Sequence, residues 1–145
     1  MKNRKKGFSL VELLIVLAVM AALIATITPV ALNAIRKSQA TKVGQNIKTL
    51  ASAFENALYV NGDVPDSISS LGRDIDSSKY GVYYTDTNGT YTVAVITSED
   101  VDRTTLEGVI QDIETGDYTG TADQNLTGGF TGTSTFYYEF SFTVY

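Results

Sequence analysis

The chain has 145 residues, enough for one small soluble domain and an appendage, and its formal net charge is −5. It contains no cysteine and no histidine, which excludes a disulfide framework, a thiolate metal site and a histidine-based catalytic triad. Residues 61–145 carry 14 acidic and three basic side chains, and this balance argues against a nucleic-acid site, because phosphates are neutralised by Lys and Arg.

A basic leader precedes a long apolar segment. Residues 1–7 contain four basic side chains and no acidic one. The 23 residues from Leu13 to Ile35 are uncharged, and as a helix they extend about 35 Å, enough to cross a bilayer core of about 30 Å. This stretch is longer than the core of a secretory signal peptide. We therefore expect a membrane span, with the basic N-terminus inside and residues 61–145 outside.

Glu12 is the one charged side chain within residues 7–32. A carboxylate in hydrocarbon costs about 2.5–3.5 kcal/mol on insertion scales. Glu12 therefore needs either a cationic partner or a position at the membrane edge, where its side chain reaches water.

The residues around Glu12 form a recognisable order: a basic leader that ends in glycine, an aromatic residue, and an acid five residues after the glycine, in Lys5-Lys6-Gly7-Phe8-Ser9-Leu10-Val11-Glu12. This order resembles the class III signal of type IV pilins and type II secretion pseudopilins. The resemblance implies cleavage between Gly7 and Phe8 by a prepilin peptidase, which then methylates the new amine of Phe8.

Cleavage at this position creates a cation close to Glu12. An α-amine has a pKa of about 7.7–8, so it is mostly protonated at neutral pH. In one continuous helix Phe8 and Glu12 lie four residues apart on the same face, so a pair within one chain is open. An amine from a neighbouring subunit is equally suitable, and the resemblance implies that Glu12 has this intersubunit role in assembly.

Helical periodicity continues past the apolar segment. Apolar side chains recur at spacings of three or four residues, at Val43, Ile47, Leu50, Ala51, Phe54 and Leu58. We expect one helix over residues 8–60, of which 8–35 form the transmembrane or filament-core part and 36–60 pack on a head domain. Asn61-Gly62 should end it.

Pro29 lies inside this predicted helix and predicts a kink, because it lacks an N–H group and crowds the carbonyl of Ala25. Thr26 and Thr28 are expected to bond the freed carbonyl groups. The resemblance implies a helix that unwinds here on assembly, and a tolerated kink without function is the alternative.

The head domain, residues 61–145, reads mainly as strands and turns. Residues 61–80 are rich in turn formers. Residues 81–85 and 91–97 predict a hairpin across Asn88-Gly89, and residues 135–145 alternate apolar and polar side chains as a half-buried strand does. Residues 104–115 fit either a helix, with Thr104 and Glu107 as a capping box, or a strand. Residues 116–134 predict a long exposed loop.

No catalytic constellation is found, so an enzyme is not expected. Four acids near glycines are weak candidates for calcium ligands, although their spacing does not fit an EF-hand: Asp112, Glu114, Asp117 and Asp123. No other cofactor is expected.

The expected fold is α+β, a long N-terminal helix packed on a small antiparallel sheet of three or four strands. The resemblance implies a prepilin of the cytoplasmic membrane that assembles as a homo-oligomeric helical filament, with the prepilin peptidase and an assembly platform as partners. The filament would be an extracellular type IV pilus. The alternatives are a minor pilin, a pseudopilin of a periplasmic pseudopilus, and a membrane-anchored binding protein that does not polymerise.

Overall fold

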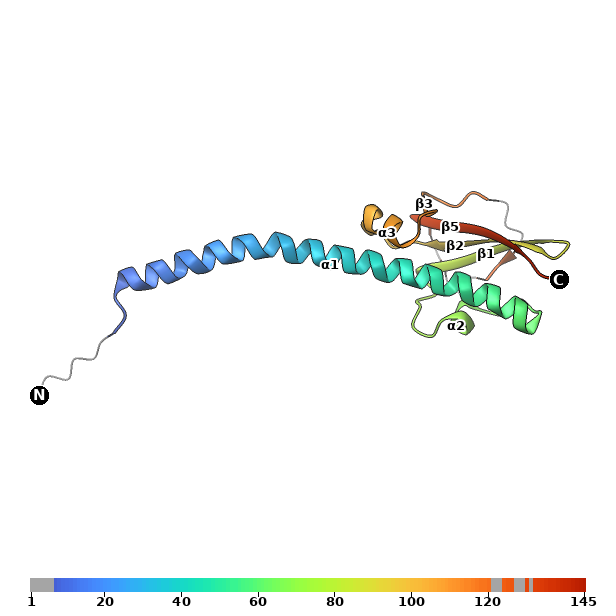
Figure 1. The fold of residues 1–145 in the computed structure, drawn as a ribbon, viewed down its shortest axis with the longest axis horizontal. Coiled ribbons are helices and arrows are strands. Elements are labelled where there is room, and N and C mark those ends of the chain that lie inside the picture. Colours follow the sequence, from blue (N-terminus) through green and yellow to red (C-terminus); the bar gives the residue numbers. More distant parts are fainter. Residues whose placement is uncertain (1–6, 121–123, 127–129, 131) are drawn as a thin grey trace, which may run out of the picture. The chain divides into compact units, whose positions relative to one another are not determined.

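The computed structural model describes residues 7–120, 124–126, 130 and 132–145, which form an α+β fold (Figure 1). The chain divides into two compact units, Met1–Arg36 and Lys37–Tyr145. One helix, α1 (Leu10–Asn61), runs through both. The predicted continuous helix is confirmed, although it begins two residues later than expected.

The first unit consists of the apolar part of α1. Its large side chains are about half exposed or more, from 49% for Leu13 to 75% for Leu10. The helix is long and apolar enough to cross a membrane by length and composition. So many exposed apolar side chains are unfavourable in water. This part of α1 therefore needs a lipid or protein environment, which the described residues do not supply.

The second unit is the head, in which the sheet packs against the other part of α1 (Figure 1). Within the described residues the sheet has five antiparallel strands in the order β3-β5-β2-β1-β4. The strands are β1 (Tyr80–Thr87), β2 (Thr90–Thr97), β3 (Glu114–Thr115), β4 (Gln124–Asn125) and β5 (Phe136–Thr143). Three or four strands were expected, and the two-residue strands β3 and β4 account for the difference.

The predicted hairpin is confirmed as β1 and β2, which pair along their full length from Tyr80–Thr97 to Thr87–Thr90. Its two-residue turn has positive φ at Asn88 (55°) and Gly89 (84°), as a turn matched to the twist of the strands requires. The N–H of Gly89 donates to the carboxylate of Asp86 at 3.0 Å. Turn chemistry therefore fixes the register of the central strands.

The predicted C-terminal strand is confirmed as β5, which pairs with β2 along its whole length. Alternate side chains of β5 face the core: Phe136 is buried, while Tyr138, Phe140 and Phe142 pack partly buried against it. The core itself lies between one stripe of α1 and the inner face of β1 and β2, and it includes Val43, Ile47, Leu50, Phe54, Leu58, Val82, Val93 and Val95.

Helix α1 ends where its sequence allows the chain to reverse. Gly62 has φ of 74°, and its N–H donates to the carbonyl of Leu58 at 3.0 Å. A left-handed glycine after the last turn satisfies a free carbonyl group at low steric cost. Residues 61–80 are mainly irregular, as predicted, but include one short helix, α2 (Ile68–Leu71), whose Ile68 is buried in the core.

Residues 104–115 contain both of the elements that the sequence left open. Helix α3 (Arg103–Val109) occupies the first half, and β3 lies at the end. The predicted capping box of Thr104 and Glu107 is wrong. Asp102 is the N-cap, and its carboxylate accepts from the N–H of Thr105 at 2.9 Å. The N-cap thus lies two residues before the predicted one, and Glu107 instead pairs with Arg103.

The prediction of a long exposed loop over residues 116–134 is correct only in part. Residues 116–120 and 132–133 are irregular and mostly exposed, but three features contradict the prediction. Strand β4 pairs with Tyr83 and Tyr84 of β1, and Leu126 is buried in the core with its N–H donating to Val82 O at 2.9 Å. Ser134 is buried as well. A two-residue strand carries no alternation that could have revealed it.

Gly44 of α1 lies directly against Val109 of α3. A Cβ built on Gly44 would lie 2.7 Å from Val109 Cγ1 and 2.9 Å from Val109 Cβ. Glycine is unfavourable within a helix by about 1 kcal/mol relative to alanine. Its presence here is explained by the packing of α3 directly on the backbone of α1.

We predict that Gly44→Ala destabilises the head by about 1–3 kcal/mol, because the overpacking cost exceeds the gain in helix propensity. Urea unfolding of the full chain in detergent, followed through head-domain tyrosine fluorescence, measures the change. Val109→Ala in the same chain removes Cγ1, the closer of the two clashing atoms, and should recover part of the loss. A Gly44→Ala variant as stable as the wild type would contradict the packing explanation.

Candidate functional site

The residues of the predicted cleavage site lie outside the helix. Gly7, Phe8 and Ser9 have no regular secondary structure, and α1 begins at Leu10. The side chain of Phe8 is 82% exposed. The peptide bond between Gly7 and Phe8 is thus two residues away from the first helical residue and is not protected by backbone hydrogen bonds of the helix.

Glu12 and Ser9 form a capping box at the start of α1. The Ser9 N–H donates to Glu12 Oε2 at 3.0 Å, and the Glu12 N–H donates to Ser9 Oγ at 3.3 Å. These two bonds satisfy donors that have no partner within the helix. The motif Ser-x-x-Glu was readable in the sequence, yet Glu12 was interpreted only as a charge and Ser9 was missed.

The capping box changes the expected geometry of a pair within one chain. Phe8 and Glu12 were placed on one helical face, but Phe8 precedes the helix in this structure. The spacing of four residues therefore does not stack their side chains. Oε2 of Glu12 is engaged by Ser9, and a carboxylate has further acceptor sites on both oxygens. Glu12 can cap its own helix and still accept hydrogen bonds from another cation.

Pro29 lies within α1, and the helix is continuous through it. The hydroxyl groups nearby donate to backbone carbonyls three or four residues back, as Ser and Thr side chains do in helices. Thr26 Oγ1 donates to Leu23 O at 2.9 Å and Thr28 Oγ1 donates to Ile24 O at 2.7 Å. Both acceptors precede Ala25, whose carbonyl faces Pro29.

The acids considered as calcium ligands do not converge where they are described. Asp117 accepts from the N–H of Ser134 at 3.0 Å, and Glu114 accepts from the hydroxyl of Tyr137. Asp112 is exposed, and Asp123 lies outside the described residues. Among the residues that the structure describes, no three acidic side chains are grouped to hold a metal ion.

Three tyrosines, Tyr83, Tyr118 and Tyr137, pack together on the face of the sheet that is turned away from the core. Tyr118 lies 5.8 Å from Tyr83 and 5.3 Å from Tyr137, measured between ring centroids. By strand register Tyr83 is beside Ala94 and Tyr137 beside Ile96, both of which are buried. The hydroxyl of Tyr118 donates to Glu139 at 3.0 Å. These contacts give the acids and tyrosines a packing role on the head.

The comparisons with known proteins concern the N-terminal part most directly. The family model described as the prokaryotic N-terminal methylation motif matches residues 2–28. The chain is also similar to fimbrial protein Q of Moraxella bovis, with 34% identity over 88 residues that cover 61% of this chain and 53% of that protein. The chain thus spans about half the length of the curated relative it matches. No solved structure matches it.

We predict that Tyr118 ionises at unusually high pH. Burial and the neighbouring Glu139 carboxylate both disfavour the phenolate and raise the pKa of Tyr118 from 10.0 to about 12. The stability gained from the neutral phenol is therefore present below about pH 10 and is lost as the pH rises through about 12.

The difference in tyrosinate absorbance between the wild type and Tyr118→Phe, recorded against pH, isolates this group. Glu139→Gln should lower the pKa of Tyr118 only in part, because burial is the larger cause. An ordinary pKa for Tyr118 in the wild type would show that the hydroxyl is not held in this contact.

Proposed function

We propose, from the premise that the chain belongs to the type IV pilin and prepilin class, that it is the structural subunit of a type IV pilus. The observation that carries the proposal is the arrangement at the N-terminus. An exposed Gly7–Phe8 segment is followed at once by a capped helix whose apolar side chains are left uncovered by the part of the chain that the structure describes. Similarity to a protein named as fimbrial favours a pilus over a pseudopilus.

In this proposal the precursor lies in the cytoplasmic membrane with its basic leader inside, and a prepilin peptidase cuts between Gly7 and Phe8. An extended, exposed peptide segment suits a protease, because a helical one would have to unwind first. The same enzyme methylates the amine of Phe8. Removal of the four basic leader side chains takes the net charge from −5 to −9. Because these cations are lost, the mature N-terminal amine becomes the nearest cation to Glu12 along the chain.

Assembly then transfers the apolar half of α1 from lipid to contacts with other copies. Both environments keep apolar side chains away from water. A carboxylate and an amine that meet inside such a bundle attract strongly, while either one left unpaired costs several kcal/mol. Because Phe8 is outside the helix, we assign the partner of Glu12 to the amine of a neighbouring copy. Pro29 is proposed to let the helix open locally as copies pack.

The first prediction from this proposal is the mass of the mature chain. Intact-mass and peptide mass spectrometry of the protein purified from its own cells should show loss of Met1–Gly7 and one methyl group on Phe8. Gly7→Val should leave the leader attached, because a β-branched side chain stiffens the extended segment next to the scissile bond. A mature protein that still carries its leader would refute the processing step.

The second prediction separates the charge of Glu12 from its role as a cap. Glu12→Gln keeps an acceptor for the Ser9 N–H but removes the negative charge, whereas Ser9→Ala removes the cap and keeps the charge. We expect Glu12→Gln to lower the yield of sheared filaments by at least about tenfold, since an unpaired buried charge costs about 3–5 kcal/mol. Ser9→Ala should assemble, with a helix weakened by about 1 kcal/mol.

Immunoblots of the membrane and sheared fractions report both yields, with electron microscopy to identify the fibres. Equal assembly of Glu12→Gln and the wild type would overturn the proposed pairing. A pseudopilin would give no surface fibres at native expression, in the wild type as well as in the variants.

A further inference from the structure

The part of α1 that enters the head is basic, whereas the rest of the head is acidic. Between residues 36 and 60 the helix has one acid, Glu55, and four basic side chains: Arg36, Lys37, Lys42 and Lys48. The ion pairs formed within the described residues are Lys79–Glu99 at 3.1 Å and Arg103–Glu107. All four basic side chains of α1 are exposed and take part in neither pair.

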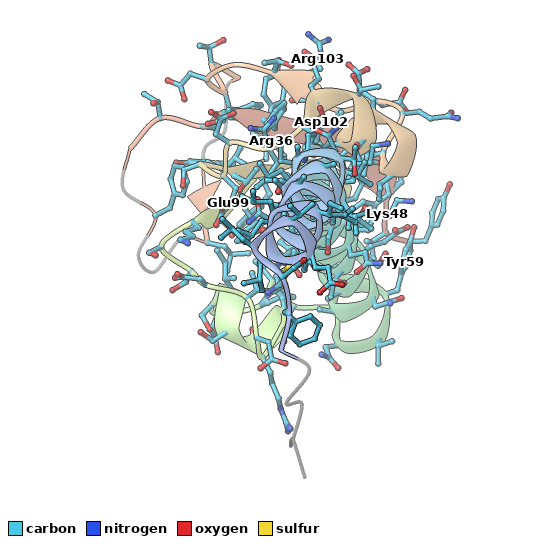
Figure 2. The ribbon with its side chains drawn as sticks, turned by 90° about the vertical axis from the view of Figure 1, so that its left-hand side faces the viewer. Arg36, Lys48, Tyr59, Glu99, Asp102 and Arg103 are labelled. Atoms are coloured by element: carbon cyan, nitrogen blue, oxygen red, sulfur yellow. The ribbon has the colours of Figure 1, made fainter. Side chains whose placement is uncertain are left out.

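An acidic cleft lies beside this part of α1. It has a volume of about 310 Å³, and its α1 wall runs from Gln39 to Asn46. Figure 2 looks along α1 from its N-terminal end and shows Glu99, which lines this cleft, on the opposite side of the helix from Lys48. The cleft is therefore confined to one flank of the helix.

Two of the acids that line the cleft have no hydrogen-bond or ion-pair partner among the described residues. Asp76 accepts from the N–H and hydroxyl of Ser78, and Glu99 is paired with Lys79. Asp74 and Asp100 are exposed and accept no hydrogen bond from the described residues. The cleft thus presents two free carboxylates next to the helix, although Lys42 of the same chain also lines it.

The proposed pairing of Glu12 sets the axial position of the next copy. If the amine of Phe8 in one copy meets Glu12 of another, parallel copies are offset along α1 by the span from Phe8 to Glu12. Because Phe8 and Ser9 precede the helix, this span is about 6–10 Å, which equals roughly four to six helical residues. The basic side chains Arg36 and Lys37 of the incoming copy then come level with residues 40–43, which lie in the stretch of α1 along the cleft.

We propose that Arg36 and Lys37 of one copy dock at the acidic cleft of the next, on Asp74 and Asp100. This inference rests on the proposed function, because the offset comes from the pairing of Glu12. The occupant is a second copy because each copy carries both halves of the contact, free cations on α1 and free carboxylates one helical turn further along. Such charge complementarity fixes register and orientation more than it adds affinity.

Proximity can be tested directly, because the chain has no cysteine of its own. Lys37→Cys and Asp100→Cys are placed in separate copies of the full chain, which are co-expressed so that a link can form only between copies. Isolated filaments are treated with a short bis-maleimide, whose two ends each add one thiol. We expect a covalent dimer in filaments and none when either cysteine variant is present alone.

The matched control pairs Lys37→Cys with Asp63→Cys. Asp63 is also an exposed acid, but it follows the end of α1 and lies beyond the reach of this offset. Filaments that form normally yet give no dimer with Asp100→Cys, or as much dimer with Asp63→Cys, would overturn the docking. Absence of filaments from the wild-type chain would instead overturn the proposed function.

A charge exchange tests whether the contact is electrostatic. Asp100→Lys and Lys37→Asp should each reduce filament yield by several-fold, and the double variant should recover most of it. All variants should still lose the leader, which separates assembly from processing. If Lys37→Asp lowers the yield while Asp100→Lys has no effect, the basic side chains act on anionic lipid headgroups and the proposal is wrong.

Discussion

The structure depends on one constraint: the two halves of helix α1 must each be stable in a different environment. Between Val43 and Leu58 the apolar side chains of α1 form one stripe, and the sheet buries it. Between Leu10 and Ile35 they surround the helix and are exposed. The sheet of the same chain covers the first pattern, whereas the second requires lipid or another protein surface. In the proposed filament, the stability of the head and the assembly of copies therefore depend on different halves of one helix.

The capping box extends this division to the N-terminus. By satisfying the first free N–H groups of α1, Ser9 and Glu12 set the start of the helix and leave Gly7 and Phe8 outside it. A helix that continued through Phe8 would place the Gly7–Phe8 peptide bond next to its first turn. The Glu12 carboxylate, which a bilayer would penalise, has a local hydrogen-bond donor in the N–H of Ser9.

Long patterns in the sequence predicted the fold well, and short ones did not. The helix, the hairpin at Asn88-Gly89 and strand β5 were each predicted from many residues with one period. A single residue that departs from the period therefore does not change the prediction. Strands β3 and β4 are two residues long and exist because longer neighbours offer them hydrogen bonds. The N-cap Asp102 was misplaced for the same reason, since one side chain decides it. At the candidate site, Gly7, Phe8 and Glu12 could be selected from their order. The capping box of Ser9 and Glu12 was overlooked although its Ser-x-x-Glu motif was readable, because Glu12 was interpreted only as a charge.

In the proposed filament, the charge of the heads means that apolar contacts alone do not let them pack closely. Residues 61–145 carry 14 acids against three bases, so neighbouring heads repel one another wherever they approach within a Debye length, about 8 Å at physiological ionic strength. Repulsion of this kind keeps heads soluble and separated unless positive charge lies between them. In this chain the free positive charge of the head is concentrated on α1, at Lys37, Lys42 and Lys48. Basic side chains on the helix therefore favour packing of heads around their helices over direct contact between acidic surfaces.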